Sequence, residues 1–168
     1  TDLLDFRKML EIEAVRLAAR RQALKTQPEN VKKARAANGQ SKIEKDFKMQ
    51  EADKCANTDV GLLEIHLENM RKALEENDIN MGAEADIQFH KTIFSLTGNM
   101  VLIKAAEFIA YILESSVKFN RAKILKDSGN AKVLYYQHKR IYEAIRDGDP
   151  ELAAEITNKH LDFVKEAT

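Results

Sequence analysis

Apolar residues recur every three or four positions along most of the chain, a spacing typical of amphipathic helices. Short polar or glycine-containing stretches separate six such segments. The predicted helices cover residues 2–24, 62–77, 81–97, 101–126, 131–146 and 150–166. No alternating strand pattern competes with them, so the sequence predicts an all-α protein.

Local signals mark several of the predicted helix ends. Gly98 is expected to end one helix because glycine adopts the left-handed conformation at little cost. Residues 127–129 (Asp-Ser-Gly) are expected to break the next. Gly148 is predicted to end a further helix, while Asp149 caps the last one and Pro150 occupies its first position.

The segment from about residue 25 to 57 differs from the rest, because it is polar and lysine-rich with few large apolar residues. A solvated helix, an irregular insertion and partial disorder all fit this pattern. Its role, whether dimer contact or disordered insert, stays open. Cys55 lies here without a second thiol, so we assign it no metal or catalytic role.

Length and composition limit the class of protein. The 168 residues suffice for one domain with a sizeable core. Lysine plus arginine equals aspartate plus glutamate at 27 each, so nothing in the charge balance indicates nucleic-acid binding by the chain itself. One cysteine permits no internal disulfide, which favours a reducing, cytoplasmic location. No apolar run is long enough to span a membrane, and no signal peptide is expected.

Three of the four histidines are candidates for a shared metal site. Asp86 and His90 lie four residues apart and therefore share a helix face. His138 and His160 lie on two later helices, each among large apolar neighbours. One carboxylate and three imidazoles suit zinc, nickel, manganese or iron. The alternative is three partly buried histidines with ordinary hydrogen bonds and a surface aspartate; His66, with charged neighbours, is expected at the surface.

Several motifs in order resemble one known family. They are residues 85–99, 147–149 and 160–161, together with the opening residues 2–11. Together they resemble the FCD domain, the ligand-sensing C-terminal domain of FadR-like GntR-type bacterial transcription regulators. The lactate- and pyruvate-responsive members are the most similar. The resemblance covers residues 2–24 and about 62–165, and leaves out the polar segment.

This resemblance implies a fold and a site. The family fold is an antiparallel bundle, here of about six to seven helices, with a central cavity. The resemblance implies that one divalent ion, zinc before nickel, manganese or iron, is bound there. The implied ligands are Asp86, His90, His138 and His160. It also implies that Arg7 and Asn99 bind the effector, although Arg7 could instead be a surface residue paired with Glu11 at helical spacing.

The resemblance also implies a role in transcription regulation. The family carries a winged helix-turn-helix domain before the sensing domain, and we expect it to be absent from residues 1–168. The chain is then predicted to bind a small organic acid (lactate, pyruvate or a relative) as a homodimer, and to reach DNA only through the missing domain. No nucleophile or general base is evident, so no enzymatic activity is predicted. A mononuclear metalloenzyme and a metal-free structural bundle are the alternatives.

Overall fold

The fold is a bundle of α-helices, as the sequence predicts. The structure, a computed structural model, describes residues 2–26 and 59–167, so nearly all of the polar segment lies outside the described residues. These two ranges contain helices and no strand. The helices are α1 (Asp2–Thr26), α4 (Gly61–Glu76), α5 (Ile79–Leu96), α6 (Met100–Leu125), α7 (Ser128–Arg146) and α8 (Pro150–Glu166).

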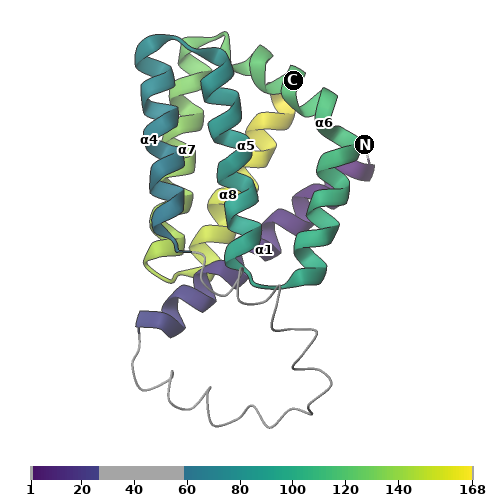
Figure 1. The fold of residues 1–168 in the computed structure, drawn as a ribbon, viewed down its shortest axis with the longest axis vertical. Helices are drawn as coiled ribbons and strands as arrows, with labels where there is room; N and C mark the ends of the chain where they lie inside the picture. Colours follow the sequence, from purple (N-terminus) through teal and green to yellow (C-terminus); the bar gives the residue numbers. More distant parts are fainter. Residues whose placement is uncertain (1, 27–58, 168) are drawn as a thin grey trace, which may run out of the picture.

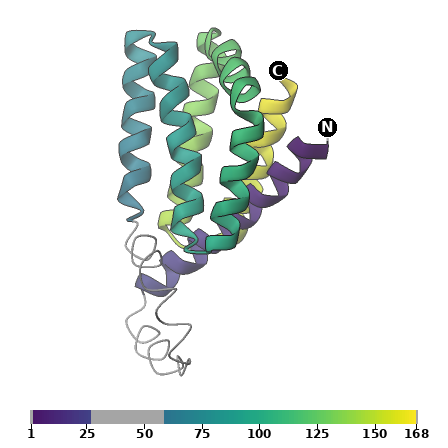
Figure 2. The ribbon, with the colours of Figure 1, turned by 45° about the vertical axis from the view of Figure 1, so that its right-hand side comes forward.

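Helices α4, α5, α7 and α8 stand side by side, and α1 crosses them obliquely (Figure 1). The most extensive contacts join α4 to α5, α1 to α8 and α7 to α8. Helix α6 lies beside α5 at the edge of the bundle, with fewer contacts to α1 and α7 (Figure 2). Among the described helices, none combines the length and the apolar character needed to cross a membrane.

The predicted helix ends are confirmed to within three residues. Asp149 accepts a hydrogen bond from the backbone N–H of Leu152, and Pro150 opens α8. Gly98 and Gly148 have positive φ angles of 54° and 72°. The predicted break near residues 127–129 is confirmed, since α6 ends at Leu125; Asp127 caps α7, which begins at Ser128, three residues earlier than predicted.

A continuous apolar core joins all six described helices, and α1 enters it through small side chains. Its buried apolar residues are Ala14, Val15, Ala18 and Ala19 on α1; Leu63, Leu67 and Met70 on α4; Ala85, Phe89, Ile93, Phe94 and Leu96 on α5; Ile103 on α6; Ile141, Ala144 and Ile145 on α7; and Ala153, Ala154 and Ile156 on α8. Small side chains permit a close approach of α1 to its neighbours. That approach buries Glu11, one turn before Val15, within the bundle.

Candidate metal centre

Three histidines from three helices meet inside the bundle. His90 comes from α5, His138 from α7 and His160 from α8, and they are 6%, 1% and 1% exposed. One ring nitrogen of each lies within 4.8 Å of the others. The convergence predicted from their positions in the sequence is therefore present.

The Nδ1 atom of each histidine faces an acceptor on the protein. His138 Nδ1 lies 2.7 Å from the carbonyl oxygen of Leu134, one turn earlier on α7. His160 Nδ1 lies 2.9 Å from the Gln137 side-chain oxygen. His90 Nδ1 lies 2.8 Å from Glu11 Oε2, although the two are not aligned as a hydrogen bond. Such partners direct Nε2, with its lone pair, towards a metal.

The distance between two Nε2 atoms tests whether an ion would fit. His90 Nε2 and His138 Nε2 are 3.2 Å apart. With Nδ1 of His138 engaged by the Leu134 carbonyl oxygen, its Nε2 can accept a proton or bind a cation placed between the two rings. Bonds of about 2.1 Å to one ion would separate two nitrogens by roughly 3.0 to 3.4 Å at tetrahedral or octahedral angles. The donor set fits a divalent ion.

Asp86 adjoins this cluster and divides its carboxylate between two partners. It is 7% exposed, and Oδ1 lies 3.1 Å from His138 Nε2. Its other oxygen, Oδ2, accepts a hydrogen bond from Nε of Arg121 on α6. Oδ1 thus faces the histidines, as a fourth ligand would, while Arg121 orients the carboxylate.

Arg121 is a residue that the sequence reasoning missed. It is 9% exposed, and burial together with the charge of Arg7 lowers its pKa to about 9, so it stays charged at neutral pH. The one available signal was its helical spacing from Ile124, which is also buried. Arginine side chains are mostly exposed in folded proteins, so this spacing alone did not indicate burial.

Glu11 links α1 to the histidines. It is 3% exposed; Oε1 accepts a 2.5 Å hydrogen bond from Arg7 Nε, and Oε2 approaches His90. Burial by itself would raise the pKa of Glu11, but Arg7 and His90 outweigh it and hold the pKa well below its usual range. The ion pair proposed as an alternative for Arg7 therefore exists, yet it lies against the cluster rather than at the open surface.

The two innermost histidines are held neutral. Burial, reinforced by repulsion from His90, lowers the pKa of His138 to about 3. Burial and repulsion from His138 and His90 also hold the pKa of His160 well below its usual value. Neutral imidazole is the form that binds metal.

A cavity of about 620 Å³ opens beside the cluster, between α1, α5 and α6. His90 and Glu11 form part of its wall, and so do Arg7 and Arg121. The cavity therefore gives a ligand access to one side of the histidine cluster and to two positive charges.

Two other residues singled out in the sequence lie elsewhere. Asn99 caps α6, where its side-chain oxygen accepts from the backbone N–H groups of Val101 and Leu102, and it is not among the residues that line the cavity. Its role in effector binding stays a prediction.

His66 is partly buried rather than fully at the surface, and its Nε2 lies 3.1 Å from the Thr92 hydroxyl.

Comparison with known proteins agrees with the motifs described above. A profile of the FCD domain matches residues 42–163, which is most of the chain. This chain belongs to the FCD domain family. The matched range holds all four predicted metal ligands and Arg121, but not Arg7 or Glu11 of α1.

Two curated relatives are similar over part of the chain. A putative L-lactate dehydrogenase operon regulatory protein of Escherichia coli (strain K12) is 30% identical over 93 residues, or 55% of this chain. A Shigella flexneri protein with the same name matches to the same extent. The chain covers 36% of the length of each relative.

Proposed function

We propose that this FCD domain is the metal-dependent sensing domain of a bacterial GntR-type transcription regulator. The observation that carries the proposal is the convergence of His90, His138 and His160, with each Nδ1 facing a protein acceptor. Asp86 completes the proposed ligand set. Zinc is the first candidate, and nickel, manganese and iron are the others.

The proposed ligand is a small organic acid. A bound divalent ion offers open coordination positions to the carboxylate and adjacent oxygen of a hydroxy or keto acid. Arg7 lines the same cavity, and its planar guanidinium can pair with a carboxylate through two hydrogen bonds. The name of the curated relatives, which refers to an L-lactate dehydrogenase operon, supports lactate and pyruvate as first candidates.

Signal transfer follows from the position of the cavity. Three helices surround it, so an acid that binds one arrangement of them more tightly than another shifts the balance between the two. We propose that this shift controls DNA binding by a winged-helix domain of the full-length regulator.

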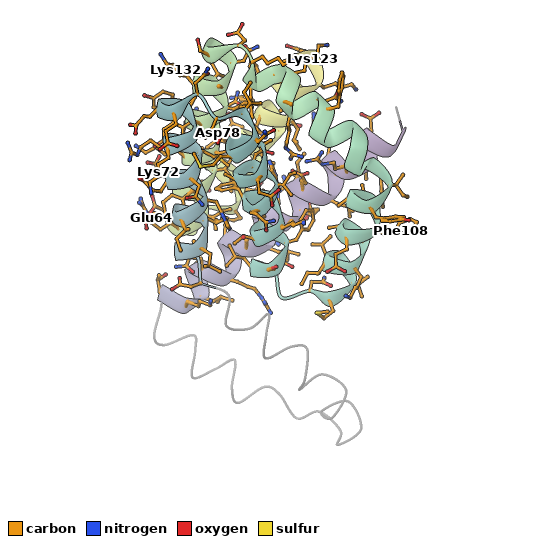
Figure 3. The ribbon with its side chains drawn as sticks, turned by 45° about the horizontal axis from the view of Figure 1, so that its top comes forward. Glu64, Lys72, Asp78, Phe108, Lys123 and Lys132 are labelled. Carbon is orange, nitrogen blue, oxygen red and sulfur yellow. The ribbon has the colours of Figure 1, made fainter. Side chains whose placement is uncertain are left out.

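The predicted homodimer is also part of this proposal. Helix α6 exposes large apolar side chains, among them Phe108, which points away from the bundle (Figure 3).

A metalloenzyme is supported less well. The carboxylate that lies against both the cavity and the histidines is Glu11, and a general base must accept a proton near neutral pH. Arg7 and His90 hold the pKa of Glu11 well below its usual range, which makes it a weak base. The arrangement favours binding over turnover.

Metal content is the direct test of the proposal. Chain purified without chelator should hold about one divalent ion, and a His90→Ala, His138→Ala double variant should hold none. His66→Ala is the matched control, because His66 lies outside the cluster and should leave the metal content unchanged. The metal-loaded protein should then unfold at a higher temperature in the presence of lactate or pyruvate. Chain that takes up no zinc, nickel or manganese would refute the proposal.

A further inference from the structure

The cavity is larger than a three-carbon acid requires. Its volume of about 620 Å³ lies within the range of sites that enclose drug-sized ligands. Even at the roughly 30 Å³ that each molecule of liquid water occupies, the six heavy atoms of lactate need only about 180 Å³. Lactate or pyruvate would leave most of the space to water.

The wall of the cavity divides into a polar part and an apolar part. Arg7, Glu11, His90 and Arg121 form the polar part, which is joined to the metal cluster by the contacts described above. Much of the remaining wall is apolar. The residues concerned are Leu10, Ile87, Phe94, Ile103, Ala106 and Ile109.

The other charged residues near the cavity lie at its exposed rim. Glu84 accepts a hydrogen bond from Gln88 on the surface of α5, and Glu107 pairs with Lys104 on α6. Lys91 is exposed as well. Apart from the hydroxyl groups of Ser95 and Tyr111, the apolar part thus offers few polar partners, and hydroxyl groups placed against it would lose hydrogen bonds to water without replacement.

We infer that the effector is an organic acid with an apolar chain or ring beyond its carboxylate head, larger than lactate and less hydroxylated than a sugar acid. This inference rests on the proposed function and specifies its ligand. The head group would lie at the cluster and the arginines, while the apolar body would lie between Ile87, Phe94 and Ile103. Each buried methylene should tighten binding by roughly fourfold.

A chain-length series tests the inference. Calorimetric titration of the zinc-loaded chain would compare lactate, 2-hydroxyhexanoate, 2-hydroxyoctanoate and gluconate. Lactate to 2-hydroxyoctanoate adds five methylenes, so affinity should rise along the three 2-hydroxy acids by about 1,000-fold when all five are buried. Gluconate should bind no better than lactate. Equal affinities along the series, or tighter binding of gluconate, would overturn the inference and leave the proposed function intact. Absence of binding by all four acids would reject both.

A variant that fills the apolar part separates cavity size from general affinity. Ala106→Phe places a ring in the apolar part of the cavity. The affinity for 2-hydroxyoctanoate should therefore fall at least about tenfold, while the affinity for lactate should not change. Ala105→Phe, one residue away and outside the cavity lining, is the matched control. Equal losses for both acids in Ala106→Phe, with normal zinc content and an unchanged helical spectrum, would contradict the inference.

Discussion

The two sides of α5 differ in how they are filled. On one side Phe89 is fully buried, and its ring meets the His138 ring edge-on with centroids 4.9 Å apart. On the other side Ile87 and Phe94 face the cavity of about 620 Å³. Tight packing can hold metal-ligating side chains in fixed positions, whereas the cavity can admit a small molecule. The contrast shows how one helix can serve both tasks.

The largest effect is expected from removing the carboxylate of Asp86, which accepts a hydrogen bond from Arg121. Asp86→Ala leaves Arg121 as a buried charge without this partner, and breaking such a pair costs about 3–5 kcal/mol. Urea unfolding of chelator-treated chain measures the loss. Asp147→Ala removes an exposed pair with Arg146 and should leave the free energy of unfolding nearly unchanged. Equal losses in the two variants would mean that Arg121 needs no buried partner.

The second largest effect is expected from lowering the pH, which should reduce the free energy of unfolding through the histidines on the packed side of α5. In the unfolded chain histidine titrates near pH 6.5, whereas the folded pKa of His138 is about 3. Below pH 6.5 the unfolded chain therefore binds more protons, and the free energy of unfolding falls by about 1.4 kcal/mol per pH unit for this residue. His160 acts in the same direction.

Urea unfolding of chelator-treated chain at pH 7.5, 6 and 5 tests this dependence. The His138→Gln variant should show a smaller decrease in the free energy of unfolding over this pH range. A free energy of unfolding that stays constant or rises as the pH falls would show that these histidines are not held neutral.

The smallest effects are expected from an alanine-to-phenylalanine substitution made once in the packed core and once in the cavity wall. Ala153 is fully buried, so Ala153→Phe overpacks the core and should cost about 1–3 kcal/mol. Ala106→Phe directs its ring into the cavity and should cost less than about 1 kcal/mol. Thermal unfolding of metal-free chain ranks the two. Equal costs would mean that the cavity wall is packed as tightly as the core.

Helix positions could be predicted from the sequence because they have local signals, whereas the set of four candidate ligands came from the family resemblance. Apolar spacing marked the helices, and Asp149 with Pro150 marked the start of α8. Asp86 and His90 share a face by their spacing alone. Glu11 was recognised only as a helical neighbour of Arg7, and Arg121 was missed, because their burial depends on helices distant in sequence.

The sequence by itself determined an all-α chain, because helix periodicity is a local property, and its motifs indicated the FCD family and four candidate metal ligands. Only the tertiary structure decided that Glu11 reaches His90, that Arg121 holds Asp86, and that a cavity adjoins the cluster. Each of these depends on how α1 and α6 pack against α5. Packing distance is set by many side chains together, so no single segment of the sequence encodes it.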